Sequence, residues 1–275
     1  MEKRHHRFLE KIPILAALVI ALVGWLILMI LMGVINAPFQ KYLPGYPSTG
    51  PIGLLVGFFL ILWFYRRRFR PEFEGNLIGG RPLMGIRLGI VILAYLLITT
   101  LVTALFTSAE YGVPGVDDIC LALVAGFGEE MCFRGLLLGS LMRQWREEKR
   151  LIPALIFSAV VFGVIHGTNV FAGASVENTL TQIVSAACLG FFLGAVYLRS
   201  GSLWPPVIMH TVVDIVAFCN ISDISDGVMV GSVTWNDWVD LALCVVVGAI
   251  GIWLIRPEKR KEVLEVWDRK WRRAA

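Results

Sequence analysis

Gly126-Phe127-Gly128-Glu129-Glu130-Met131-Cys132-Phe133-Arg134-Gly135 lies inside an otherwise apolar stretch that runs from 119 to 142. A stretch of this kind is long enough to cross a bilayer, which takes about 20 residues as a helix. Its middle nevertheless carries three ionisable side chains, those of Glu129, Glu130 and Arg134. A charge at the bilayer centre costs about 3 kcal/mol or more, so such residues usually have a function. This segment predicts a membrane helix that carries chemistry.

The composition of the whole chain agrees with a membrane location. Hydrophobic residues make up 57% of the chain and charged residues only 17%, which is typical of an integral membrane protein and excludes an ordinary soluble domain. The net charge of +4 comes from basic residues that cluster at the ends of apolar segments. We therefore expect the lipid bilayer as the surrounding medium and no nucleic-acid partner.

The apolar segments predict an all-α fold, a polytopic membrane bundle of about eight transmembrane helices. The expected spans are 12–35, 51–65, 86–107, 119–142, 151–170, 179–198, 203–220 and 236–255. Loops with basic clusters alternate with acidic or neutral loops along this set. The positive-inside rule then places both termini in the cytoplasm. We expect a multi-pass protein of the plasma membrane, most simply a bacterial inner membrane.

Three regions follow from the distribution of polar residues. Residues 1–118 hold three spans and are expected to be a membrane scaffold, and 119–220 form a catalytic core of four spans. Residues 221–275 hold the last span and a basic amphipathic cytoplasmic tail. The apolar residues of 257–275 recur at roughly helical spacing, so we expect this tail to lie on an anionic inner leaflet, with a solvated tail as the alternative.

Later spans add further polar groups to the pair of glutamates. His166 ends the run Phe162-Gly163-Val164-Ile165-His166, and His210 precedes Asp214 by one helical turn. On an α-helix each residue advances by about 100°. Glu130 and Arg134 therefore share a face and are expected to form a structural ion pair. Glu129 is turned away from Glu130 and is expected to point at the reaction centre as a general base.

The depth of these groups suggests how water reaches them. Glu129, His166 and His210 are all expected near the midplane or in the inner half of the bilayer. We therefore expect the site to open toward the cytoplasmic side.

Glu129-Glu130-xxx-Arg134, Phe162-xxx-His166 and His210-xxx-Asp214 resemble, in order and spacing, the motifs of the CPBP intramembrane protease family. That family joins type II CAAX prenyl endopeptidases to bacterial Abi proteins that process bacteriocins or confer immunity to them. The resemblance covers about residues 119 to 220. It implies an endopeptidase that cleaves a membrane-associated peptide or protein, lipidated or not. It makes no prediction of oligomeric state.

The resemblance also implies roles for four residues. Glu129 would activate water with help from His166, and His210 with the residue four positions later would stabilise the oxyanion. The family often has Asn at that later position, where this chain has Asp214. An ionised Asp cannot donate to an oxyanion. We favour a role in orienting His210, while a protonated Asp214 or a metal ligand stays open.

Two mechanisms remain open at this point. A glutamate-type route needs no cofactor, and we favour it because the chain lacks an HExxH pair. A zinc-dependent route would use Glu129, His166 and His210 as ligands, with Asp214 as a further donor.

Two other classes of protein fit parts of the pattern. A non-catalytic immunity or scaffold protein would keep the polar groups for stability. A proton-coupled transporter would use them as a relay, but transporters commonly have two related halves and this chain shows no such repeat. Glu129→Gln separates the three classes, because it abolishes proteolysis, leaves a scaffold working and uncouples a transporter from pH.

Overall fold

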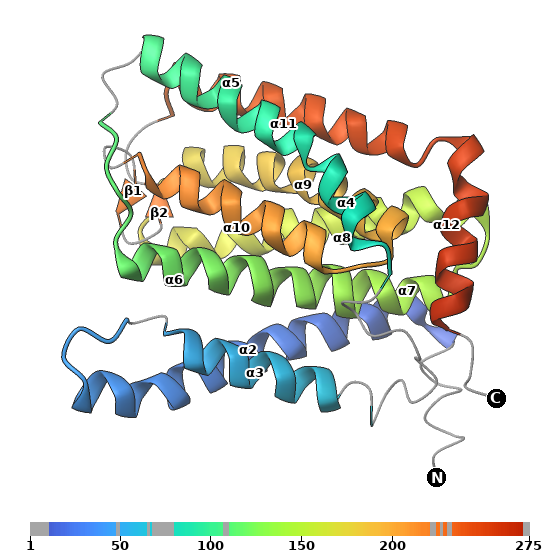
Figure 1. Cartoon of the computed structure of the whole chain (residues 1–275), viewed down its shortest axis with the longest axis horizontal. Helices are drawn as coiled ribbons and strands as arrows, with labels where there is room; N and C mark the ends of the chain where they lie inside the picture. The colour runs from blue at the N-terminus through green and yellow to red at the C-terminus, as the bar shows by residue number, and fades with distance from the viewer. Residues whose placement is uncertain are drawn as a thin grey trace.

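The structure is a computed structural model that describes residues 11–47, 50–64, 67, 80–106, 110–220, 224–225, 228–229 and 233–271. Helices make up almost all of this part of the chain (Figure 1). In chain order the elements are α2 (Pro13–Tyr42), α3 (Pro51–Phe64), α4 (Pro82–Leu88), α5 (Ile90–Phe106), α6 (Val116–Val124), η2 (Ala125–Leu138), α7 (Gly139–Gln144), α8 (Glu148–Ile165), η3 (His166–Ala172), α9 (Val176–Ser200), α10 (Trp204–Phe218), β1 (Ile224–Ser225), β2 (Val228–Met229), α11 (Trp235–Leu254) and α12 (Pro257–Lys270). The two short strands pair antiparallel.

The all-helical, multi-pass architecture predicted from the sequence is confirmed. Among the described residues, 5 helical segments are long and apolar enough to cross a membrane. They are Pro13–Tyr42, Pro82–Phe106, Glu148–Phe171, Val176–Ser200 and Trp235–Leu254. Two shorter apolar helices, Pro51–Trp63 and Trp204–Phe218, lie among them. The count of about eight spans, the orientation of the termini and the division into three regions stay predictions.

Part of the predicted charge alternation falls on residues that the structure does not describe. The basic groups at 3–10, at Arg66 and at 68–70 lie outside the described residues, as do Asp223 and Asp226. The basic residues of 143–150, Arg199 and α12 lie within them.

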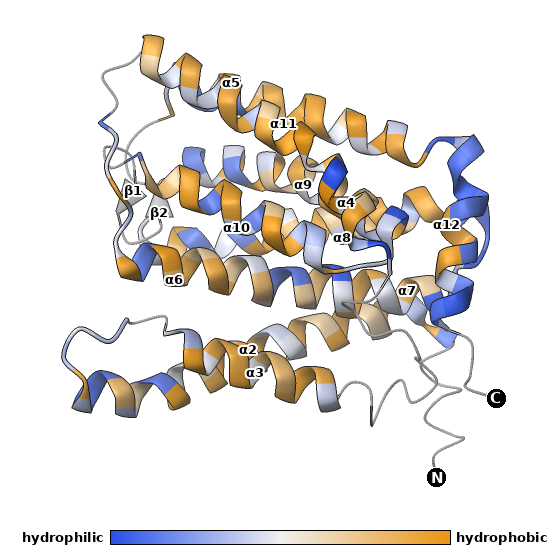
Figure 2. Ribbon diagram, in the orientation of Figure 1, coloured by the Kyte–Doolittle hydropathy of each residue, from blue (hydrophilic) through white to orange (hydrophobic). Residues whose placement is uncertain are grey.

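The helices stack side by side, with α12 crossing their ends (Figure 1). The pair α2 and α3 packs along one edge of the bundle and contacts η2. Helix α9 contacts α8 and α11, and α11 also packs against α5. Hydrophobic residues run along the long helices, whereas hydrophilic residues gather on α12 (Figure 2). This distribution fits helices in lipid with a polar element across one end.

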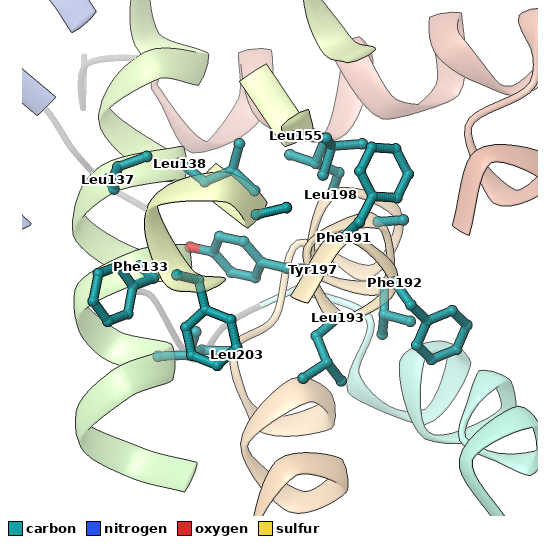
Figure 3. Packing of buried hydrophobic residues seen from close by; sticks show 14 of the residues in the cluster. Phe133, Leu137, Leu138, Leu155, Phe191, Phe192, Leu193, Tyr197, Leu198 and Leu203 are labelled. Carbon is teal, nitrogen blue, oxygen red and sulfur yellow. The ribbon is translucent and has the colours of Figure 1, made fainter. Parts of the chain in front are cut away.

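Close packing fixes η2 against its neighbours, and η2 carries the paired glutamates. Figure 3 shows side chains of η2, α8 and α9 packed together. Phe133, Leu138, Phe192 and Tyr197 are fully buried there. Van der Waals packing of this kind is a main force between helices in lipid, and it holds the glutamates at a defined depth and rotation.

The segment that carries the glutamates is a π-helix and not the α-helix predicted from the sequence. η2 covers Ala125–Leu138, and the Gly139 N–H at its end bonds to the carbonyl of Arg134, five residues earlier. A π-helix winds more loosely than an α-helix, is rare, and occurs often at functional sites. Neighbouring residues on the wider helix are separated by a smaller angle. The angle between Glu129 and Glu130 is therefore somewhat smaller than the expected 100°, and Glu130 is still the partner of Arg134.

Helix α12 packs its apolar face on protein, and its expected position on the inner leaflet stays a prediction. Val263 and Trp267 are buried, and the Trp267 indole N–H donates to the Leu198 carbonyl at 3.1 Å. The ring also packs edge-on against Tyr197, with centroids 5.1 Å apart. An amphipathic pattern indicates that one face of the helix is apolar, but that face can be buried equally well against protein or against lipid. Here it is buried against the ends of α8 and α9.

Candidate active site

The buried ion pair expected between Glu130 and Arg134 is present. Arg134 Nη1 lies 2.8 Å from Glu130 Oε1, and both side chains are fully buried. The guanidinium carbon lies 4.1 Å from the centre of the Phe162 ring. Gly190 leaves room for this arrangement, because a Cβ there would meet Arg134 Nη2 at 2.7 Å. Arg134 is thus enclosed by a carboxylate, an aromatic face and a glycine backbone.

Glu130 has a second partner that the sequence did not predict. His210 Nδ1 lies 2.9 Å from the same Oε1 atom. An ionised carboxylate only accepts hydrogen bonds, so Nδ1 carries the proton and donates. Glu130 therefore links Arg134 on its own helix to His210 on α10.

The other nitrogen of His210 faces two further carboxylates. His210 Nε2 lies 3.6 Å from Asp214 Oδ2 and 4.0 Å from Glu129 Oε2. The side chains of Glu129 and Asp214 are 22% and 23% exposed, whereas that of Glu130 is fully buried. Both distances exceed a hydrogen bond and leave space for a bridging water or a substrate atom. Three of the four predicted site residues thus meet around one histidine nitrogen.

A glycine allows η2 and α10 to approach this closely. A Cβ on Gly126 would overlap Thr211 Oγ1 and would lie 3.0 Å from the Val207 carbonyl oxygen. Both of these residues belong to α10, on either side of His210 in sequence. The small residue at 126 therefore sets the helix separation at which His210 reaches Glu130.

His166 takes a different position from the other three. It ends α8 and begins the 3₁₀ segment η3, and its Nδ1 lies 2.9 Å from the Phe162 carbonyl oxygen. A carbonyl only accepts, so Nδ1 carries the proton and Nε2 is left as a proton acceptor. No hydrogen bond joins His166 to Glu129 within the described residues. The predicted partnership of these two residues is not a direct contact here.

Phe162 connects the two histidines. Its ring packs edge-on against His166 and His210, with centroid distances of 5.1 and 5.6 Å. It also lies under the Arg134 guanidinium. The sequence indicated Phe162 only as a member of a motif, because one sequence gives no sign of which rings a Phe will contact.

A cavity of about 290 Å³ adjoins the site. His166, His210 and Asp214 lie in its wall, together with Phe162. Glu129 is not among the lining residues, so a substrate in this cavity meets His210 and Asp214 first.

The cavity extends toward the end of the bundle opposite α12. Tyr111, Asn220 and Asn236 line it there, at the ends of elements that face away from the basic residues. The sequence predicted access from the basic, cytoplasmic end, and the side of the membrane on which the site opens stays a prediction. His166, which was expected inside a span, stands at the end of α8 that lies away from the basic residues.

The described residues contain no group of three His, Cys, Asp or Glu side chains arranged to hold a metal ion. Glu129, His166 and His210 accordingly do not form a zinc site in this arrangement. Zinc stays the alternative that a chelation experiment tests.

Comparison with known families supports the interpretation of this region. A family model described as Rce1-like, type II CAAX prenyl endopeptidase, matches residues 115–216. The matched segment starts at α6 and ends within α10, so it contains Glu129, His166, His210 and Asp214. The resemblance to the CPBP family is confirmed over this segment. No match was found among curated proteins or among solved structures.

Proposed function

We propose that this protein is an intramembrane endopeptidase that hydrolyses a peptide bond of a membrane-associated protein or peptide. The observation that carries the proposal is the meeting of Glu129 and Asp214 at His210 Nε2, inside the segment that matches a family of proteases. A buried charged cluster in a membrane protein requires a functional reason. Hydrolysis supplies one, since it needs a base, an acid and an oxyanion partner at one place.

Glu129 is proposed as the general base. It takes a proton from water, and the resulting hydroxide attacks the carbonyl carbon of the scissile bond. The proton then passes to the leaving amine. His166 assists through Nε2, the nitrogen that its bond to the Phe162 carbonyl leaves as an acceptor. Because Glu129 and His166 share no direct hydrogen bond, a water molecule between them is needed to carry the proton from one residue to the other.

His210 is proposed to act as an imidazolium, which the carboxylates of Glu129, Glu130 and Asp214 around it favour, and to stabilise the oxyanion through its Nε2–H. Its other nitrogen donates to Glu130, which Arg134 holds in turn. This chain of contacts fixes the plane of the imidazole ring and aims Nε2 at the reaction centre. Preorganised donors of this kind are often a large source of catalysis. Glu130 and Arg134 are then positioning residues.

Asp214 is proposed to orient His210. It is on the same face of α10 as His210, and its Oδ2 lies 3.6 Å from Nε2. At this distance its negative charge attracts the Nε2–H without a direct hydrogen bond, so the N–H stays available to donate to the oxyanion when it forms.

The proposed enzyme works in a bacterial plasma membrane and requires no cofactor. The experiment that tests this uses the purified full chain in nanodiscs with fluorogenic peptides, prenylated and unprenylated. Wild type and Glu129→Gln are compared with and without a chelator. Cleavage by wild type that survives chelation and is lost in Glu129→Gln supports the glutamate-type mechanism.

Other results of the same experiment point elsewhere. Loss of cleavage on chelation with recovery on adding zinc supports the metal-dependent route through Glu129, His166 and His210. Equal cleavage by Glu129→Gln overturns the proposed role of this residue. Absence of cleavage for every peptide favours a non-catalytic immunity or scaffold protein.

A further inference from the structure

A second polar cluster lies in the wall of the same cavity, and the proposed mechanism does not use it. The Tyr95 hydroxyl donates to Asp240 Oδ1 at 2.6 Å. The Cys244 thiol lies 3.6 Å from the Tyr95 oxygen and 3.8 Å from Asp240 Oδ2. Tyr95, Asp240 and Cys244 all line the cavity.

This cluster belongs to different helices from the proposed catalytic groups. Tyr95 is on α5, and Asp240 and Cys244 are on α11, which lie next to each other along one edge of the bundle (Figure 1). The catalytic groups of the cavity wall come from η3 and α10. One cavity thus connects a site for bond cleavage with a separate carboxylate.

The cavity wall is acidic. Asp214, Asp237 and Asp240 line it, and its described lining residues include no Lys or Arg. Asp237 caps the start of α11, because it accepts hydrogen bonds from the backbone N–H and the hydroxyl of Thr234. Asp214 faces His210. Asp240 is therefore the carboxylate of this wall that is engaged neither in a helix cap nor at the proposed reaction centre.

One carboxylate oxygen of Asp240 accepts a strong hydrogen bond, and the other can still accept one from a ligand. Oδ1 accepts from Tyr95, which fixes the carboxylate plane, whereas among the described residues the one hydrogen-bonding group beside Oδ2 is the weakly polar Cys244 thiol. A carboxylate among apolar helices is costly unless a cation or strong donors compensate it. A bound basic side chain would supply that compensation. The cavity is near the lower end of the usual size of small-molecule pockets, which suits one long side chain.

We propose that Asp240, oriented by Tyr95, is a specificity-determining residue that binds a Lys or Arg side chain of the substrate peptide. This inference rests on the proposed function, because it places the bound side chain and the scissile bond in one cavity. A purely structural Tyr95–Asp240 bond that joins α5 to α11 is the competing explanation. The two explanations differ in whether the peptide's charge matters.

The test measures peptide binding without cleavage. Full-length Glu129→Gln in nanodiscs is titrated separately into each of two fluorescent peptides, and binding is followed by fluorescence anisotropy. The two peptides are identical except at one position, which is Lys in one peptide and norleucine in the other. The same titration is made with Glu129→Gln/Asp240→Asn. The Asn amide oxygen can still accept from Tyr95, so the bond between α5 and α11 is kept. The control is Glu129→Gln/Asp268→Asn, which makes the same change on α12, where Asp268 is half exposed beside Arg146.

The expected result is a loss in affinity for the Lys peptide of about tenfold to a hundredfold in the Asp240→Asn background, as for a lost charged hydrogen bond. The norleucine peptide and the Asp268→Asn control should change less than about twofold. Equal affinity of the two peptides for Glu129→Gln, an equal loss for both peptides, or no binding of either overturns the proposal. Cleavage by wild type separates these results from a failure of the proposed function, since it is measured with Glu129 intact.

Discussion

Two glutamate–arginine pairs occupy opposite environments in this molecule. Glu130 and Arg134 are fully buried in η2 at 2.8 Å. Glu262 and Arg81 join α12 to the start of α4 at 2.9 Å, with side chains 34% and 41% exposed. The chemistry and the distance are the same, but only the first pair is closed off from water. The difference shows that burial, and not the presence of an ion pair, decides what such a contact does.

The buried pair positions a proposed catalytic side chain, whereas the exposed pair links helix α12 to the rest of the bundle. Glu130 accepts a hydrogen bond from His210 and so fixes the orientation of that ring. Glu262 instead lies near three cations at one end of the bundle, with Arg199 at 3.4 Å and Lys259 at 3.7 Å in addition to Arg81. Losing one cation there leaves two others and water. Losing Arg134 leaves a buried carboxylate with His210 alone.

The largest effect on stability is expected from Arg134→Met. It leaves Glu130 as a buried charge without its cation, which costs about 3–5 kcal/mol. The double variant Glu130→Gln/Arg134→Met should recover a large part of this loss, because no unpaired charge remains and the Gln oxygen still accepts from His210. Thermal unfolding in detergent measures both variants. With Glu130→Gln measured alone as well, a double variant destabilised by the sum of the two single losses would show that the pair is not a coupled unit.

Gly190→Ala is expected to come next. The added methyl carbon would lie 2.7 Å from both Arg134 Nη2 and Phe162 Cδ1, and overpacking of this kind costs about 1–3 kcal/mol. Because the guanidinium must shift, cleavage should fall together with the unfolding temperature. Gly33→Ala is the matched control, since a Cβ at Gly33 meets nothing within 4 Å. Equal unfolding temperatures for the two variants would contradict the tight enclosure of Arg134.

At the end of the bundle that α12 covers, Lys270 is a buried basic residue whose charge affects stability. Burial lowers the pKa of its ammonium from 10.5 to about 8. Between these values the folded protein loses the proton while the unfolded chain keeps it, so the stability rises with pH from about 8 to 10.5. Below pH 8 both states are charged, and burial of the charge is a cost of about 3 kcal/mol.

Lys270→Met should therefore stabilise the protein at pH 7 and remove the rise. Unfolding temperatures of wild type and variant, taken at pH 7 and at pH 10, measure this. The prediction is wrong if the difference between them is the same at both values. The other titrating groups are the same in both proteins and cancel in this difference.

The smallest effect is expected for the exposed pair. Arg81→Gln or Glu262→Gln should cost at most about 1 kcal/mol, and less at high salt, because water screens the charges. Trp267→Ala is the positive control for the docking of α12, since its ring is buried and its N–H bonds to Leu198. A loss on Arg81→Gln as large as that on Arg134→Met would remove the contrast between the two regions.

Much of the site followed from the sequence, because its signals were charges in apolar segments. The ion pair needs only the spacing of Glu130 and Arg134, and one turn between His210 and Asp214 puts both on one side of α10. The family motifs then indicated which groups belong together, and the match over 115–216 agrees.

The rest depended on tertiary structure. The π-winding of η2 cannot be seen in residue spacing. The contact between Glu130 and His210 joins residues 80 apart in sequence. Tyr95 and Asp240 are 145 residues apart, and no local pattern connects either pair. The position of His166 depends on the exact end of α8, which the sequence pattern does not define.

The central claim is that two neighbouring glutamates have different tasks, with Glu129 activating water and Glu130 holding His210. The direct measurement is peptide cleavage and thermal unfolding of Glu129→Gln and Glu130→Gln side by side. We predict that Glu129→Gln lowers kcat by at least about 10³-fold, the loss of about 4 kcal/mol of transition-state stabilisation, while its unfolding temperature stays near that of wild type. Cleavage at the wild-type rate by Glu129→Gln would contradict the account.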